Sequence, residues 1–314
     1  MTMNGMELSR AYFDAYGRDL IENKYGVCQG QLAAGLVGEG SECFGYDDQF
    51  SQDHDFGPGF CIWMPKHMYD QIGGAMQQDY DRMPQEFMGY RRMVTPQAGK
   101  RVGVFCIDDF YQRYIGLPRE PRDNMEWMRI PESFLATATN GRVFCDNLGE
   151  FTRIRNCLEN FYPLDVQKKK LAARAAVMAQ AGQYNYPRCM QRGEYGAAYL
   201  ACAEFLRTAL SAIYLLNGKY MPFYKWSFRG ARELTSLRDA VDELQQLLLI
   251  PDDLTNGGRK QQMIEEICIK IGREFNYRGL TRTSEAFLQV HGEELMRSIS
   301  DPRLAGMHIL ADAK

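Results

Sequence analysis

Short apolar runs interrupted by glycines dominate the first half of the chain. Residues 7–23 place apolar side chains at helical spacing, which predicts a helix. The run at residues 32–37 ends in Gly38-Glu39-Gly40-Ser41, a pattern typical of a buried strand that enters a tight turn. Further apolar runs predict strands at residues 53–56 continuing into 60–63 after a Gly-Pro-Gly break, at 102–107, and at 142–145.

After Tyr162-Pro163 the apolar residues recur with a helical period instead. The pattern predicts helices at residues 166–181, 194–217, 236–250, 259–275 and 284–300. Ser236 is placed to cap the third of these helices and Pro251 to end it. Helices with one apolar face and short connections favour a bundle. We therefore predict an α+β fold, with a small mixed β-sheet domain over residues 1–163 and an all-α helical bundle over residues 164–314.

The composition is that of a globular protein, since 45% of the 314 residues are hydrophobic and 25% are charged. A net charge of -3 provides no overall attraction for a polyanion, so nucleic acid is not a required partner. Nine cysteines without a Cys-x-x-Cys pair exclude a zinc ribbon and favour free thiols in a reducing cytoplasm. The N-terminus lacks the apolar core of a signal peptide. The apolar stretch at residues 197–216 carries Glu204 and Arg207, which favours a buried helix over a membrane span.

The stretch that can carry chemistry is residues 38–56. Asp53 and Asp55 are two positions apart, so on a strand both carboxylates point to one face, about 6.6 Å apart. Such a pair can hold divalent metals, which sit about 3.5–4 Å apart in two-metal sites, and its oxygen ligands suit Mg²⁺. Gly40 lets the backbone approach a phosphate closely, and the amide and hydroxyl of Ser41 can donate to it. The intervening residues 42–52 suffice for a short helix and a return.

Each half of this pattern also has an ordinary interpretation. An isolated Asp-x-Asp is more often a solvated turn, and a lone Gly-Ser is weaker evidence still. Asp47 and Asp48 are expected to be turn residues rather than ligands. Other chemistries lack their residues: the chain has no P-loop sequence, no nucleophile elbow, and no histidine pair at helical ligand spacing. Specificity therefore comes from the order and spacing of the whole motif.

With these residues the sequence resembles the nucleotidyltransferase superfamily, which has a DNA polymerase beta-like fold. The signature of that superfamily is Gly followed by Gly or Ser, a spacer of this length, and Asp-apolar-Asp; His54 departs from its apolar position. The stretches GSECFGYDDQFSQDHDFGPGF, GRVFCDNLGEFTRIRNCLENFYPLDV and LLNGKYMPFYKW look like a poorly characterised bacterial family. Its members join a nucleotidyltransferase domain to a helical domain, an architecture similar to that of kanamycin nucleotidyltransferase.

The resemblance implies that Asp53 and Asp55 are catalytic metal ligands and that Gly40 and Ser41 bind the nucleotide. A third carboxylate is usual on a neighbouring strand, but Gly103 occupies the expected place in the run at residues 102–107. For this role we choose Asp108 over Asp109 and Asp146, which lie farther from that place.

Lys225 is the candidate nucleotide-binding residue of the helical half, where a compact cation could meet the charge of a triphosphate. The equal alternative is a lysine whose stem covers apolar surface while its head stays in water. Its neighbours Tyr224 and Trp226 are expected to be core residues rather than platforms on which a nucleotide base stacks. The run at residues 168–170, three lysines, is expected on a solvated helix face.

The expected reaction is transfer of a nucleoside monophosphate from a nucleoside triphosphate to a hydroxyl-bearing acceptor, with release of pyrophosphate. Mg²⁺ or Mn²⁺ is the expected cofactor, and a small-molecule acceptor is favoured over a protein or RNA terminus. The alternative is a nucleotide-binding regulatory module that has lost turnover, and an acid beside Asp53 and Asp55 would discriminate the two. We expect a cytoplasmic protein with no membrane partner, and leave a homodimer open.

Overall fold

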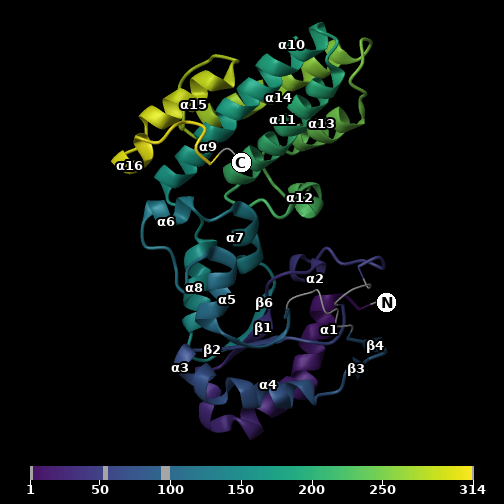
Figure 1. Cartoon of the computed structure of the whole chain (residues 1–314), viewed down its shortest axis with the longest axis vertical. Coiled ribbons are helices and arrows are strands. Elements are labelled where there is room, and N and C mark those ends of the chain that lie inside the picture. Colours follow the sequence, from purple (N-terminus) through teal and green to yellow (C-terminus); the bar gives the residue numbers. More distant parts are fainter. Residues whose placement is uncertain (1–2, 52–55, 93–99, 313–314) are drawn as a thin grey trace. The chain divides into compact units, whose positions relative to one another are not determined.

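The computed structural model describes residues 3–51, 56–92 and 100–312. Within them the chain has a mixed fold, with one small mixed sheet and many helices (Figure 1). Two compact units are present, one formed by Met1–Pro121 and Phe134–Asn160 and the other by Arg122–Ser133 and Phe161–Lys314. The single boundary near residue 163 stays a prediction. The two units are described separately below.

The first unit is built on a four-stranded sheet in the order β5-β2-β1-β6. Its strands are β1 Ala33–Leu36, β2 Cys61–Met64, β5 Gly103–Cys106 and β6 Arg142–Asp146. Strand β1 pairs antiparallel with both β2 and β6, whereas β2 pairs parallel with β5. Each strand falls on one of the predicted apolar runs at 32–37, 60–63, 102–107 and 142–145. Of the strand predicted at residues 53–56, residues 53–55, with Asp53 and Asp55, lie outside the described residues, and Phe56 is not in a strand.

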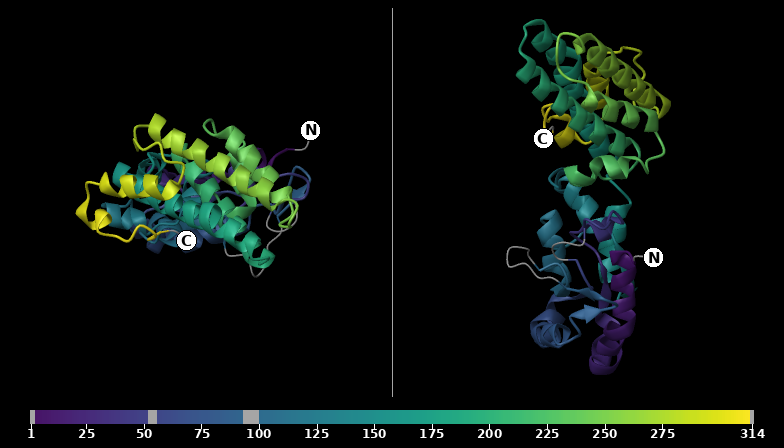
Figure 2. Two further views of the ribbon diagram at one scale, coloured as in Figure 1. Left: turned by 90° about the horizontal axis from the view of Figure 1, so that it is seen from above. Right: turned by 90° about the vertical axis from the view of Figure 1, so that its right-hand side faces the viewer.

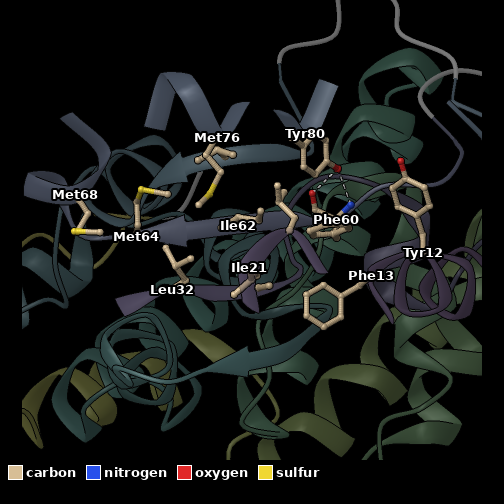
Figure 3. Packing of buried hydrophobic residues seen from close by; sticks show 13 residues of the cluster. Tyr12, Phe13, Ile21, Leu32, Phe60, Ile62, Met64, Met68, Met76 and Tyr80 are labelled. Atoms are coloured by element: carbon tan, nitrogen blue, oxygen red, sulfur yellow. Dashed lines mark hydrogen bonds between the residues drawn. The ribbon is translucent and has the colours of Figure 1, made fainter. Parts of the chain in front are cut away.

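Alternate side chains of β2 bury on opposite faces of the sheet, as the two-residue period of a strand requires. Ile62 and Met64 join a core cluster with Phe60 and Tyr80, where the Tyr80 hydroxyl donates to the Phe60 carbonyl at 2.7 Å (Figure 3). Trp63 faces the other way and stacks on Phe151, with ring centroids 4.0 Å apart. The sheet therefore carries a core on each face.

Helices supply the other half of each core. The cluster in Figure 3 takes residues from four helical segments that cover this face of the sheet: α1 Gly5–Tyr12, the π-helical segments Phe13–Gly17 and Leu20–Lys24, and α4 Gly74–Asp81. These N-terminal segments together cover the predicted helix at residues 7–23. The second face packs against α5 Ile107–Ile115 and α8 Glu150–Glu159. Smaller elements of this unit are α2 Ser41–Phe44, α3 Lys66–Met68, β3 Glu86–Phe87 and β4 Tyr90–Arg91. Helix α6 Asn124–Met128 belongs to the second unit, and α7 Glu132–Thr139 begins in the second unit and continues in the first.

The second unit is a bundle of helices, shown from two further directions in Figure 2. Helix α9 packs against both α11 and α15. The helices are α9 Leu164–Met178, α10 Tyr186–Gln191, α11 Tyr195–Leu216, α12 Tyr224–Ala231, α13 Arg238–Leu249, α14 Gly257–Tyr277, α15 Leu288–Arg297 and α16 Pro302–Ala305. All five predicted helices are present, and α13 ends before Pro251 as predicted. Ser236 as the cap of α13 was wrong, because Leu237, in the left-handed region, precedes the helix without a side-chain cap.

Helix α11 is the one helix, in the described part of the chain, that is long and apolar enough to cross a membrane. The most apolar 18-residue stretch of this helix is 67% buried within the structure, as in the core helix of a globular protein. Glu204 and Arg207 form an ion pair on its exposed face at 2.8 Å. The cysteines are free thiols, as predicted.

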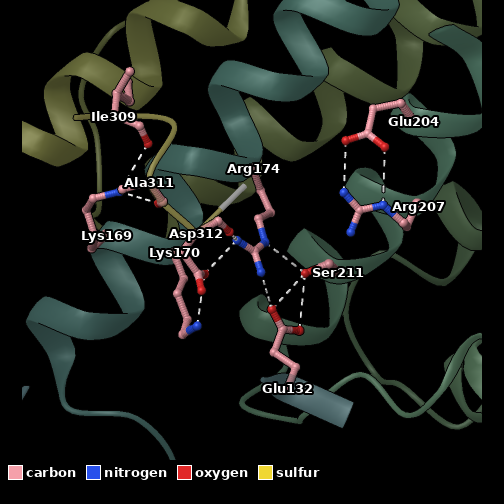
Figure 4. A network of polar contacts seen from close by, with 10 residues as sticks. All are labelled: Glu132, Lys169, Lys170, Arg174, Glu204, Arg207, Ser211, Ile309, Ala311 and Asp312. Atoms are coloured by element: carbon pink, nitrogen blue, oxygen red, sulfur yellow. Dashed lines mark hydrogen bonds and ion pairs between the residues drawn. The ribbon is translucent and has the colours of Figure 1, made fainter. Parts of the chain in front are cut away.

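The expectation of a solvated lysine face at residues 168–170 was wrong. Lys169 and Lys170 are almost fully buried, because the C-terminal segment folds over this part of α9 and supplies oxygen acceptors (Figure 4). The Lys169 ammonium donates to the carbonyls of Ile309 at 3.1 Å and Ala311 at 2.8 Å. Lys170 pairs with the Asp312 carboxylate at 2.9 Å. Burial is the largest cause that shifts the pKa of Lys169, and it lowers that pKa to about 8.

Arg174 links this cluster to a second carboxylate. Its guanidinium pairs with Glu132 at 2.6 Å and with Asp312 at 2.8 Å, and its Nε donates to the Ser211 hydroxyl at 3.0 Å. Ser211 in turn donates to Glu132 at 2.9 Å. Burial disfavours the charge, but the two carboxylates outweigh it and raise the pKa of Arg174. The charges of Arg174 and Lys170 are thus balanced by those of Glu132 and Asp312, and each one depends on its partners.

Arg174→Met tests this dependence, with Arg207→Met as a control on the exposed Arg207–Glu204 pair of the same bundle (Figure 4). Removing Arg174 leaves Glu132 buried without its cation, so we expect a loss of about 3–5 kcal/mol in the free energy of unfolding. The exposed pair should contribute under about 1 kcal/mol. Chemical denaturation measures both, and equal losses in the two variants would contradict the account.

Candidate functional site

Strand pairing brings three separate chain segments to one edge of the sheet. Gly35, near the end of β1, pairs with Cys61 at the start of β2. Cys61 also pairs with Gly103, where β5 begins. Because β1 runs antiparallel to β2 and β5 runs parallel to it, residues 38–41 leave the sheet where residues 56–60 and 100–102 enter it. We call this edge the turn edge and residues 38–41 the Gly-Ser turn.

The Gly-Ser turn needs glycine at two positions. Gly38 has φ +125° and Gly40 has φ +127°, both in the region that side chains with a Cβ rarely adopt. The Gly38 amide donates to the Asn140 side-chain oxygen at 2.9 Å, and the Asn140 amide donates back to the Gly38 carbonyl at 2.7 Å. Arg155, which is buried, donates to the Asn140 carbonyl at 2.7 Å. The side chain of Asn140, whose own backbone is held by Arg155, therefore fixes the turn at Gly38 through two hydrogen bonds. We call these two residues the scaffold of the turn.

Two arginines flank the Gly-Ser turn. Arg101 donates to the Glu39 carbonyl at 2.6 Å and pairs with the Glu42 carboxylate at 2.8 Å. Arg113, near the end of α5, pairs with the Glu39 carboxylate at 3.0 Å. Guanidinium groups recognise phosphate through paired hydrogen bonds. Arg101 and Arg113 therefore give the turn edge donors that suit a phosphorylated ligand.

A third arginine shapes the start of β2. Arg92 donates to the Pro58 carbonyl at 2.9 Å and to the Tyr80 hydroxyl at 2.7 Å. Gly57 has φ +143°, and a Cβ there would lie 2.6 Å from the Arg92 Cα, so the Gly-Pro-Gly break lets two backbones approach closely. Burial is the main cause that raises the pKa of Tyr80, so its hydroxyl stays protonated near neutral pH.

A small pocket opens at the turn edge. Its lining includes Glu39 and Glu42 from the Gly-Ser turn and α2, Phe56 ahead of β2, and Arg92 and Arg101. Sequence reasoning missed these arginines. The one signal in the sequence is that Arg101 directly precedes the apolar run at residues 102–107. The proximity of Arg101 to the Gly-Ser turn depends on a strand order that the sequence does not reveal.

The predicted nucleotide-binding residues Gly40 and Ser41 lie together at the turn edge, and Ser41 is buried at the start of α2. Asp53 and Asp55 lie outside the described residues. Phe56, the next residue in the chain after Asp55, lines the pocket. Within the ranges that the structure describes, no group of three or more His, Cys, Asp or Glu side chains could hold a metal.

The structure does not bring Asp108 to the Gly-Ser turn. Asp108 lies in the first turn of α5, beyond the end of β5 that is opposite the turn edge. At the turn edge β5 begins with Gly103, whose φ is +116°, and a Cβ there would lie 2.7 Å from the Gln77 side-chain oxygen. The alternative Asp146 accepts from the amides of Gly149 at 2.9 Å and Thr152 at 2.7 Å, ahead of α8.

Lys225 lies in the first turn of α12 in the second unit, and its ammonium sits 5.0 Å from the ring centroid of Trp226. Its predicted contact with a triphosphate stays a prediction. The expectation of Tyr224 in the core was wrong, because its side chain is 76% exposed. Asp48 begins a turn as expected, since it accepts from the Phe50 amide at 2.9 Å. Asp47 lies outside regular structure and accepts from the Gly5 amide at 2.7 Å.

One comparison with known proteins gives a match, and it covers part of the chain. A family model described as a domain of unknown function, DUF4037, matches residues 127–227. The DUF4037 match runs from α6 to α12 and contains neither the Gly-Ser turn nor Asp53 and Asp55. No curated protein and no solved structure matches the chain. The comparisons thus support a domain of unknown function, and the resemblance to nucleotidyltransferases stays a prediction.

Asn140→Ala tests the scaffold of the Gly-Ser turn. The change removes both hydrogen bonds to Gly38, so we expect a loss of about 1–3 kcal/mol in the free energy of unfolding and faster hydrogen exchange at the Gly38 amide. The control is Asn147→Ala, which removes a single exposed hydrogen bond to the Gln29 carbonyl. An unchanged exchange rate at Gly38 in Asn140→Ala would show that the turn holds its conformation without Asn140.

Proposed function

We propose that this chain is a metal-dependent nucleotidyltransferase that transfers a nucleoside monophosphate from a nucleoside triphosphate to a hydroxyl acceptor. The observation that carries the proposal is the meeting, at the turn edge, of the Gly-Ser turn with the segment that follows Asp55. A phosphate-binding turn and metal-binding carboxylates must lie side by side for this chemistry, and antiparallel pairing of β1 with β2 is a topology that does this.

The chain's own groups have distinct roles in the proposal. Gly40 presents bare backbone to the phosphates, and Ser41 donates its amide and hydroxyl to them. Arg101 adds positive charge beside the turn. Asp53 and Asp55 hold Mg²⁺ or Mn²⁺, which supplies charge neutralisation and Lewis acidity to the phosphoryl group when bound. The acceptor oxygen forms a bond to the α-phosphorus, the bond to the bridging oxygen breaks, pyrophosphate leaves, and the acceptor proton passes to solvent.

The acceptor is proposed to be a small-molecule hydroxyl, and the compartment the cytoplasm. At a net charge of -3 the chain has no general attraction for a nucleic acid, which favours a small acceptor over an RNA terminus.

A second candidate function is a nucleotide-binding regulatory module without turnover. It is favoured by β5, which borders β2 and consists of Gly103, Val104, Phe105 and Cys106, none of them acidic. Asp108 lies in α5, beyond the end of β5 that is opposite the turn edge. Pyrophosphate release from a magnesium triphosphate, measured over a panel of hydroxyl acceptors, separates the two functions: the transferase releases it with one acceptor class, and the module binds triphosphate but releases none.

Asp53→Asn and Asp55→Asn test the metal site directly. Each removes one charged oxygen ligand, so we expect magnesium-dependent triphosphate affinity to fall about tenfold or more in both variants. Isothermal titration calorimetry with and without Mg²⁺ measures the change. The control is Asp70→Asn, since Asp70 pairs with Lys66 on the surface beyond the other end of β2. Wild-type affinity in both site variants, with an unchanged melting temperature, would sink the proposed metal site.

A further inference from the structure

The Arg101 guanidinium occupies the space against the Gly-Ser turn. An added Cβ at Gly40 would collide with Arg101 Nη2 and would come within 2.5 Å of Glu42 Oε1. In this structure, Arg101 and its carboxylate partner Glu42 therefore occupy the space that a side chain at position 40 would need. A phosphate that approaches the turn meets this ion pair first.

The two partners reach the turn in different ways, and Arg101 also donates to the Glu39 carbonyl through Nε at 3.2 Å and Nη2 at 2.6 Å. The stem of Glu42 packs against the start of α1, since a Cβ at Gly5 would lie 2.5 Å from Glu42 Cβ. Arg101 reaches the turn from the segment ahead of β5 through a long side chain, which can adopt other rotamers. Both side chains keep some solvent access, 18% for Arg101 and 13% for Glu42, so a soluble anion can compete for the guanidinium.

We propose that Glu42 holds Arg101 as a stand-in for phosphate, and that a bound triphosphate takes over the Arg101 guanidinium from Glu42. The inference rests on the proposed function, because it assigns Arg101 to the phosphates at the Gly-Ser turn. Carboxylate and phosphate both accept paired hydrogen bonds from a guanidinium, so one can replace the other. Arg101 is then a ligand-binding residue, and Glu42 is a negative regulator of affinity that competes with the substrate.

This exchange predicts opposite effects for the two members of one ion pair. Arg101→Gln removes the donor, so magnesium-triphosphate affinity should fall about tenfold or more, the scale of a lost charge-assisted interaction. Glu42→Gln removes the competing charge but keeps the size of the side chain, so affinity should rise about threefold to tenfold. Arg101→Lys keeps a point charge without the planar fork and should fall between wild type and Arg101→Gln.

The experiment is titration of the full chain with a nonhydrolysable adenosine triphosphate analogue and Mg²⁺, followed by calorimetry. The melting temperature of each variant without ligand reports folding, and Arg18→Gln, at an exposed pair with Asp14, is the matched control. A structural pair would weaken binding from both sides or from neither, so affinity changes of one sign in Arg101→Gln and Glu42→Gln overturn the inference. If wild type binds and Arg101→Gln is unchanged, the inference alone fails. If wild type binds no triphosphate, the proposed function fails with it.

Discussion

The antiparallel pairing of β1 with β2 is the constraint on which the candidate site depends. It sets the end of one strand beside the start of the other, so the Gly-Ser turn and the segment that follows Asp55 share an edge. Parallel pairing of β2 with β5 adds Arg101 to the same edge and sends Asp108 to the opposite one. A single topological arrangement therefore accounts for the residues that meet and for the carboxylate that does not.

Features encoded by a local period could be predicted from the sequence. The strands at residues 32–37, 60–63, 102–107 and 142–145 and the five helices after residue 163 were found because two-residue and 3.6-residue periods reflect burial directly. The tight turn at Gly40 and Ser41 was found because such a turn restricts backbone torsions and so restricts residue types. The cap at Ser236 failed because Leu237 adopts a left-handed conformation that no local pattern announces.

Charged partners distant in sequence could not be predicted in this way. Lys170 and Asp312 are 142 residues apart, and three consecutive lysines look solvated until the C-terminal segment that covers them is known. Arg101 and Glu42 are likewise joined only by the strand order. In both units, then, the ionic contacts depend on tertiary arrangement, and the sequence alone shows only their members.

The central claim is that the Gly-Ser turn and the Asp53–Asp55 pair form one triphosphate site. A crystal structure of the full chain with Mg²⁺ and a nonhydrolysable nucleoside triphosphate tests it most directly. We expect metal density between the carboxylates of Asp53 and Asp55, with the phosphates against the Ser41 amide and the Arg101 guanidinium. Nucleotide bound away from the turn edge, or phosphates at the turn with no metal at either aspartate, would contradict it.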